Sequence, residues 1–155
     1  MGQGSCATPE EYLDAERGAL FKSEYFDGDI YAVAPARPRH TRIATNLTAR
    51  LLLALDGGPW QVFNSDMRVH IPATGLYTYP DVSVVCGEPV FVRSDNLANP
   101  ILVIEALSKS TKRYDRTEKF LHYQSRSSLK EYLLVSHDPR MLTHCTSNRS
   151  RGLAD

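Results

Sequence analysis

The chain has 155 residues, a length that allows one domain with a single mixed core and is too short for two independent cores. Lysine plus arginine and aspartate plus glutamate each total 18, so the net charge excludes a global attraction to nucleic acid or to a membrane surface. No stretch approaches the roughly 20 apolar residues of a membrane span, and the N-terminus lacks the basic and apolar regions of a secretory signal, which favours a cytoplasmic location.

The N-terminal part is expected to form a short helix and a hairpin. Thr8, followed by a proline and two acids, has the pattern of a helix N-terminus and predicts a helix over residues 9–17. Asp27-Gly28 tolerates the positive φ angles of a tight turn. The segments on either side, 22–26 and 29–33, are therefore predicted to pair as antiparallel strands.

The next segment is the clearest helix prediction in the sequence. After Pro35 and Pro38 interrupt the chain, apolar residues recur at helical spacing until Gly57-Gly58-Pro59 ends the segment. The residues of this apolar side are Ile43, Leu47, Leu51, Leu52 and Leu55.

Further strands are predicted in the second half of the chain. Half-buried strands are expected at 61–64, 66–71 and 78–86, with 89–100 as a connecting loop. Residues 101–107 are almost continuously apolar, which predicts a strand covered on both faces at the centre of the sheet. A helix that starts at Ser110 or Thr111, and another buried strand at 131–136, complete a mixed α/β domain.

Positive charge gathers between residues 109 and 130. Seven basic residues there greatly outnumber Asp115 and Glu118: Lys109, Lys112, Arg113, Arg116, Lys119, Arg126 and Lys130. The pattern fits a local nucleic-acid-binding surface and equally a solvated helix face with ion pairs four residues apart.

One carboxylate is chemically out of place. Glu105 lies in the middle of the most apolar strand, where an unpaired carboxylate costs on the order of several kcal/mol. A neighbouring base, a buried hydrogen-bond network or a bound cation would stabilise it. If Asp81 lies on the adjacent strand, the two acids repel each other unless a divalent metal such as Mg²⁺ sits between them. The alternative, in which Glu105 emerges at a sheet edge and pairs with a base such as Arg113, has equal weight on these residues alone.

Both acids belong to a longer ordered pattern. It comprises Tyr79-Pro80-Asp81-Val82-Ser83-Val84-Val85, then Val103-Ile104-Glu105-Ala106-Leu107-Ser108, Ser110-Thr111, Asp115 and Glu118-Lys119. In this pattern the chain closely resembles the Uma-type putative restriction endonucleases, formerly a domain of unknown function, within the PD-(D/E)XK nuclease superfamily. The resemblance runs from about residue 8 to residue 138 and is specific as an ordered combination.

The resemblance implies a restriction-endonuclease-like fold, with a central mixed β-sheet flanked by helices, and a DNA endonuclease that depends on Mg²⁺ or Mn²⁺. It makes Asp81 and Glu105 the catalytic metal ligands. The superfamily's usual lysine position, two residues after the second acid, is Leu107 here. The resemblance therefore assigns the catalytic lysine to Lys119 on the following helix, and the alternative is that Lys119 is an exposed helix lysine.

Accessory residues are also implied. Glu24 resembles an acid that approaches the metal centre in superfamily nucleases, or it only pairs with Lys22 or Arg17. His40 heads the long helix and either reaches the phosphate or is structural. Basic residues that we expect to contact DNA phosphates are Lys109, Lys112, Arg113 and Arg116.

The C-terminal segment departs from the family pattern. We expect a domain at 1–140 and a divergent, truncated tail at 141–155. Truncation would leave a sheet edge or a core face uncovered, and the alternatives are then a homodimer, reduced stability or an inactive remnant. Three functions remain: a metal-dependent endonuclease, a catalytically impaired nucleic-acid-binding or structural member of the same fold, and a phosphodiesterase for small nucleotides. Leu107 and the missing C-terminal part favour the second function, and the two acids in apolar strands favour the first.

Overall fold

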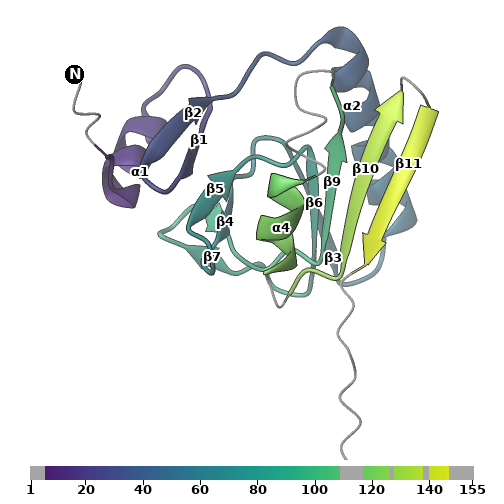
Figure 1. The fold of residues 1–155 in the computed structure, drawn as a ribbon. Coiled ribbons are helices and arrows are strands. Elements are labelled where there is room, and N and C mark those ends of the chain that lie inside the picture. The colour runs from purple at the N-terminus through teal and green to yellow at the C-terminus, as the bar shows by residue number, and fades with distance from the viewer. Residues whose placement is uncertain (1–5, 109–116, 126–127, 138–139, 147–155) are drawn as a thin grey trace, which may run out of the picture.

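The protein is described by a computed structural model that covers residues 6–108, 117–125, 128–137 and 140–146 (Figure 1). A five-stranded mixed sheet forms its centre. In spatial order the strands are β11 (Arg140–Thr146), β10 (Glu131–His137), β9 (Leu102–Ala106), β6 (Val82–Cys86) and β3 (Trp60–Asn64). Strand β9 pairs in parallel with β10 and antiparallel with β6, so the apolar segment at 101–107 lies at the centre of the sheet, as its composition predicts.

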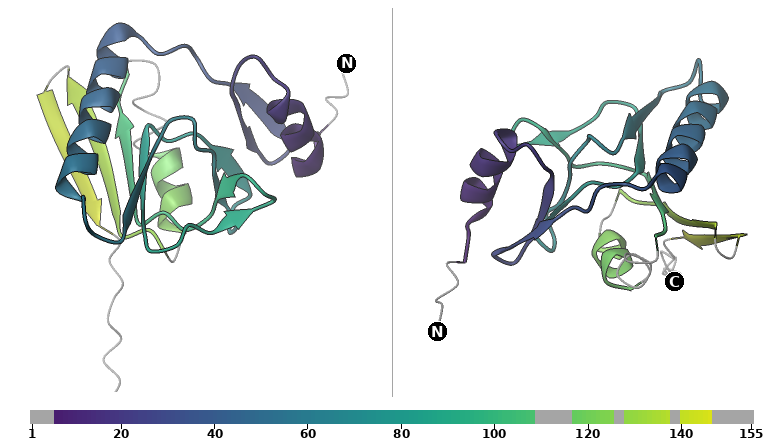
Figure 2. Two further views of the ribbon diagram at one scale, coloured as in Figure 1. Left: turned by 180° about the vertical axis from the view of Figure 1, so that it is seen from behind. Right: turned by 90° about the horizontal axis from the view of Figure 1, so that it is seen from above.

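Helices cover both faces of this sheet. Helix α2 (Pro38–Ala54) lies on one face and α4 (Glu118–Gln124) on the other, as the view from above shows (Figure 2). The main apolar cluster lies between the sheet and α4 and includes Val103, Leu107 and Tyr123. The predicted fold class, a central mixed sheet flanked by helices, is therefore confirmed.

A second, six-stranded sheet lies beside the central one and carries the N-terminal hairpin (Figure 1). In spatial order its strands are β2 (Asp29–Ala32), β1 (Ser23–Phe26), β5 (Leu76–Thr78), β4 (Val69–Ile71), β8 (Asn96–Leu97) and β7 (Phe91–Val92). Helix α1 (Pro9–Arg17) packs against this sheet through Tyr12 and Leu13, which form an apolar cluster with Tyr25 and Tyr77.

The predicted N-terminal elements are confirmed. Thr8 caps α1 through a capping box with Glu11. Asp27 and Gly28 take φ angles of 49° and 88° between β1 and β2, the left-handed conformation that a tight hairpin turn requires.

The single strand predicted at 78–86 is wrong. The chain leaves β5 at Thr78, passes through Tyr79–Asp81 without strand structure, and enters β6 in the other sheet at Val82. Pro80 has no N–H to donate to a sheet ladder, which explains the break. Asp81 consequently lies at the point where the chain crosses from one sheet to the other.

Two other predictions need correction. Residues 89–100 are more than a connecting loop, because they contain the two-residue strands β7 and β8. Residues 141–146 are not tail, because β11 pairs with β10 along its whole length, from Arg140 opposite His137 to Thr146 opposite Glu131. The sequence is only weakly apolar there, so pairing with β10, and not burial, gives this segment its strand structure.

The structure contains helices in both of the remaining segments where they are predicted. Helix α2 begins at Pro38, but none of its residues is fully buried, and Leu53 is 80% exposed. Helix α4 is described from Glu118, so the expected start at Ser110 or Thr111 lies outside the described residues. Within the described ranges, no helix combines the length and the apolar character that crossing a bilayer requires.

Candidate active site

A cleft of about 680 Å³ lies between the hairpin, the start of α2, helix α4 and the adjoining ends of β6 and β9. Its acidic, basic and histidine lining residues are Glu24, Arg37, His40, Asp81, Glu105, Glu118, Lys119 and His122. The structure thus brings together five of the residues that the sequence singles out, although they come from five separate segments. Among the described lining residues, four carboxylates face two cations, an excess of two negative charges when both histidines are neutral.

Asp81 and Glu105 face the same side of the central sheet. Val82 pairs with Ile104 in the antiparallel ladder between β6 and β9, so the same register places Asp81 opposite Glu105. Residues directly opposite each other in an antiparallel pair project to the same face. Both side chains line the cleft, and the residues are only 8% and 4% exposed. Glu105 lies in a central strand, so the alternative that places it at a sheet edge is wrong.

Each oxygen of the Asp81 carboxylate has a partner. The backbone N–H of Ala106 donates to Oδ2 at 2.7 Å, and His40 Nε2 lies 3.0 Å from Oδ1. His40 comes from the first turn of α2, so this contact joins the helix to the crossing point between the sheets. The carboxylate is therefore fixed in direction by one strand and one helix.

Lys119 is buried in the cleft and contacts two acids. Its Nζ lies 3.2 Å from Glu105 Oε1 and 3.3 Å from Glu24 Oε1, and the residue is 5% exposed. The alternative of an exposed helix lysine is wrong. Leu107 lies in the apolar cluster with Tyr123, so the strand position that carries the lysine in the usual superfamily pattern points into the core.

Glu24 is held by the second sheet. Its Oε1 accepts a hydrogen bond from the Thr78 hydroxyl at 2.6 Å and one from the Tyr79 N–H at 3.4 Å. The partners expected as alternatives are engaged elsewhere, because Lys22 pairs with Asp66 and Arg17 pairs with Asp14 and Asp95. Glu24 therefore contributes its charge to the cleft and not to a surface ion pair.

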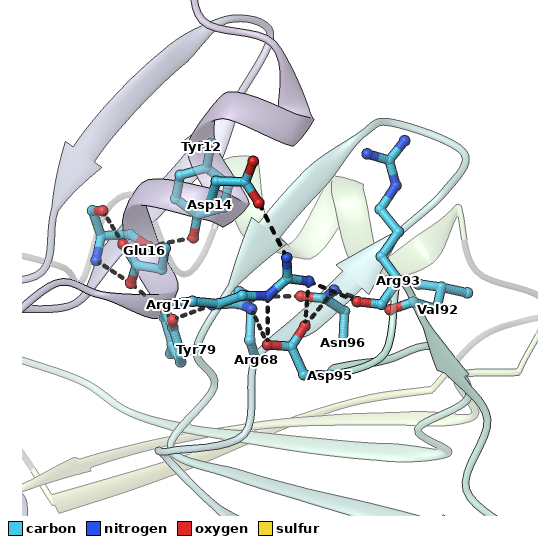
Figure 3. Close-up of polar contacts among 11 residues, drawn as sticks. Tyr12, Asp14, Glu16, Arg17, Arg68, Tyr79, Val92, Arg93, Asp95 and Asn96 are labelled. Atoms are coloured by element: carbon cyan, nitrogen blue, oxygen red, sulfur yellow. Dashed lines mark hydrogen bonds and ion pairs between the residues drawn. The ribbon is translucent and has the colours of Figure 1, made fainter.

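A polar network behind the cleft holds Tyr79 in place (Figure 3). The Tyr79 hydroxyl donates to Glu16 Oε1 at 2.8 Å and accepts from Arg68 Nη1 at 2.8 Å. Glu16 also accepts from the Ser23 N–H at 2.8 Å, and Arg68 donates to Asp95 at 2.9 Å. The network ties α1, the hairpin and the second sheet to one cleft residue.

Burial keeps this tyrosine protonated. Burial and the hydrogen bond to Glu16 raise the pKa of Tyr79 to about 12. Near neutral pH its hydroxyl is therefore a fixed hydrogen-bonding group. No local pattern in the sequence predicts that Glu16 and Tyr79 meet, because they are far apart in the chain.

Two other histidines differ in their relation to the cleft. His122 lines it, its Nδ1 lies 2.8 Å from Thr74 Oγ1, and burial lowers its pKa. His70 is not among the lining residues, and its ring stacks on Tyr77 with centroids 4.0 Å apart. The four expected DNA contacts lie outside the described residues: Lys109, Lys112, Arg113 and Arg116.

The donor set of the cleft suits a hard divalent cation. Asp81 and Glu105 provide carboxylate oxygens on one face of the sheet, and Mg²⁺ is bound in proteins through one or two carboxylates with water completing its shell. The described residues contain no cluster of three or more histidine, cysteine or acidic side chains placed to hold a metal. Among the described residues, the ligands of a metal would therefore be Asp81, Glu105 and water molecules. Mn²⁺ accepts the same oxygen ligands.

Comparisons with known proteins identify the family of the chain. Residues 9–153 match the family model described as "Uma2: Putative restriction endonuclease". Two proteins of Synechocystis sp. (strain ATCC 27184 / PCC 6803 / Kazusa), both named as uncharacterized, are similar over 83% of this chain. One, slr1290, is 43% identical over 68% of its own length, and the other, sll1609, is 39% identical over 73% of its own length.

A solved structure shares the fold. It is described as a putative nuclease belonging to DUF820 from Anabaena variabilis ATCC 29413, and it superposes with a TM-score of 0.74 at 18% sequence identity. The alignment covers 91% of this chain and 80% of the other. The likeness at this identity concerns the fold, and it confirms the restriction-endonuclease-like architecture.

Proposed function

Because the chain belongs to the Uma2 family of putative restriction endonucleases, we propose that it is a metal-dependent nuclease that hydrolyses DNA phosphodiester bonds in the cleft. The observation that carries the proposal is the buried contact between Lys119 and Glu105 beside Asp81. Buried and closely placed ionisable groups in a cleft are typical of catalytic sites.

Charge in the cleft supports the metal dependence. Among the described lining residues, the negative charges still outnumber the positive charges by one if His40 is protonated. A negatively charged cleft repels a phosphodiester unless a cation is added. Asp81 and Glu105 would hold such a cation, which when bound would activate a water and offset charge on the phosphate.

The protein's own side chains have separate tasks in this proposal. Lys119 would place a fixed positive charge next to the phosphate, where negative charge grows in the transition state. Glu24 would orient that ammonium, and His40 would hold the Asp81 carboxylate in one direction. Tyr79, protonated and fixed, would form a wall of the cleft that does not ionise during turnover.

The position of Lys119 also bears on the non-catalytic alternative. Leu107 in the usual lysine position favours an impaired member of the fold, but the ammonium on α4 contacts the same acid that a strand lysine would flank. This contact weakens one of the two sequence features that favour the alternative, the leucine at position 107. The small-nucleotide alternative has no specific support from the cleft, whose described lining residues come from several separate elements.

The test is the nicking of supercoiled plasmid and of single-stranded DNA with Mg²⁺ or Mn²⁺. We expect the wild type to cut and Asp81→Asn and Glu105→Gln each to lose on the order of a hundredfold or more in rate. Glu88→Gln, which neutralises an exposed acid outside the cleft, is the matched control. Equal cutting by all four proteins, or none by the folded wild type on either substrate, would overturn the proposal.

A further inference from the structure

Positive charge is concentrated on α2. Between Asp29 and Asp56 the sequence contains no acid and four arginines, in a chain whose charges balance in total. The arginines are Arg37, Arg39, Arg42 and Arg50, and all four are exposed. Within the described part of the chain, none of the ion pairs involves them, in contrast to Arg17, Arg68 and Arg93.

Three of these arginines lie on one face of the helix. Arg39, Arg42 and Arg50 follow the three- and four-residue spacing that aligns side chains along an α-helix, with Asn46 between them. From Arg39 to Arg50 the row extends roughly 16 Å along the helix axis. The half-buried residues of α2 that lie on another side of the helix include Ala44, Thr48 and Leu51, and α2 contacts strands of the central sheet. We call this row of three the arginine face.

A groove beside this row leads to the proposed active site. It has a volume of about 360 Å³, and helix α2 lines it with small side chains that include Ala44, Thr45 and Ala49. Ala49 lies seven residues after Arg42, two turns further along the same side of α2, so the groove borders the arginine face at Arg42. At its other end the groove is lined by His40 and Asp81, which also line the main cleft. The two hollows therefore meet at the carboxylate that we propose as a metal ligand.

We propose that the arginine face binds the sugar-phosphate backbone of a nucleic-acid strand and that the adjoining groove guides this strand to Asp81. The inference rests on the proposed nuclease function, because a phosphodiester at Asp81 must continue as a strand on either side. Arginine suits the contact, since its planar guanidinium forms paired hydrogen bonds to phosphate. Small floor residues let the strand approach the helix, and their hydroxyl groups offer further hydrogen bonds.

The test separates binding from cutting. Fluorescence anisotropy in EDTA would measure the affinity of labelled single-stranded DNA, duplex DNA and single-stranded RNA for the wild type and for the double variant R39Q/R42Q. The charge-matched control is R17Q/R93Q, which removes two arginines from α1 and the β7–β8 turn, on the side of the molecule away from α2 (Figures 1 and 2). Loss of net charge is then equal in both double variants.

We expect R39Q/R42Q to bind on the order of tenfold more weakly and to lower the slope of log affinity against log salt by about 1.4 on a single strand. The control should stay close to the wild type. Equal weakening in both double variants would show a general charge effect and overturn the inference, as would unchanged binding in R39Q/R42Q. Binding to anionic lipid vesicles that depends on Arg39 and Arg42, without binding to any of the three oligonucleotides, would also overturn it.

The double variant R39Q/R42Q is expected to fold like the wild type. The arginines make no ion pair in the described part of the chain, and Arg39 and Arg42 lie toward the positive end of the helix dipole, which repels them. Their replacement by glutamine should leave the thermal midpoint unchanged or slightly higher. Selective loss of binding in R39Q/R42Q without any cutting by the wild type would sink the nuclease function alone. Cutting by the wild type with unchanged binding in R39Q/R42Q would sink the arginine face alone.

Comparing the three oligonucleotides shows whether the arginine face binds DNA or RNA. A selective loss on DNA supports the inference together with the DNA specificity that we propose. A selective loss confined to RNA supports the arginine face as a backbone-binding surface and transfers the substrate of the cleft to RNA.

Discussion

Lys119 on α4 lies 3.2 Å from Glu105 on β9, fourteen positions earlier in the chain. The contact places an ammonium beside the strand acid from outside the strand. Leu107, two residues after Glu105, is buried in the apolar cluster instead. The positive charge beside Glu105 therefore comes from Lys119 on the helix that covers the sheet, and the side chain at position 107 packs in the core.

Moving the lysine back to the strand is expected to fail. Lys119→Met should lower DNA cutting on the order of a hundredfold and destabilise the fold by about 3–5 kcal/mol, because Glu105 loses its buried cationic partner. Leu107→Lys in the same background should not restore cutting and should destabilise further, since it buries an ammonium among apolar side chains. Cutting rates and urea unfolding of both variants are the measurements, and recovery of activity in the double variant would contradict the assignment. Lys119→Arg, which keeps the charge, controls for the loss of packing.

Metal binding should be visible without turnover. Because a ligand that binds only the folded state raises its stability, Mg²⁺ or Mn²⁺ at a hundredfold excess over its Kd should add about 2.7 kcal/mol to the wild type. Asp81→Asn and Glu105→Gln should lose this gain, and Glu88→Gln should keep it. Thermal unfolding with metal and with EDTA provides the comparison. An equal rise of the thermal midpoint on metal addition in all four proteins would mean that the metal binds outside the cleft.

Alkaline pH should weaken the fold through Tyr79. The pKa of this phenol is about 12 in the folded protein and 10.0 in its ordinary state, so above pH 10 the unfolded chain loses the proton first. Its contribution to the free energy of unfolding is fully present below pH 10 and is lost as the pH rises toward 12. Burial also raises the pKa of Tyr12, so part of the same decline comes from that residue.

Tyr79→Phe isolates the contribution of one hydroxyl. The variant should show a shallower decline in stability between pH 10 and 12, and at neutral pH it should lose about 1–3 kcal/mol because Glu16 and Arg68 each lose a hydrogen bond. Tyr31→Phe is the control, since that hydroxyl is exposed and only weakly bonded to Asp29. Urea unfolding over this pH range measures both. A decline as steep as that of the wild type would show that Tyr79 is not the titrating group.

His40 is expected to act by positioning Asp81. His40→Gln should reduce cutting roughly tenfold, less than the loss in Asp81→Asn, because the Ala106 N–H still holds the other carboxylate oxygen. Raising the Mg²⁺ concentration should recover part of the activity, since the ligand itself remains. His70→Gln, a change outside the cleft lining, should leave cutting near the wild-type level. A loss in His40→Gln that no metal concentration relieves would argue against a positioning role.

The sequence by itself determined the helix at 9–17, the hairpin turn at Asp27-Gly28 and the central position of the strand at 101–107. These features depend on local turn chemistry and on the composition of single segments, which can be read without knowing neighbours in space. The pairing of Asp81 with Glu105 was likewise within reach, because two acids in apolar strands need a shared explanation.

Only the tertiary structure decided which groups meet those acids. The approach of Lys119 to Glu24, the hydrogen bond from Tyr79 to Glu16 and the separation of 78–86 into two sheets all join segments far apart in the chain. Such contacts follow from the packing of helices and sheets against each other, and no periodicity within one segment encodes them. The cleft therefore forms only when the helices and sheets pack together, although Glu24, Asp81 and Glu105 can be identified as candidate site residues from the sequence.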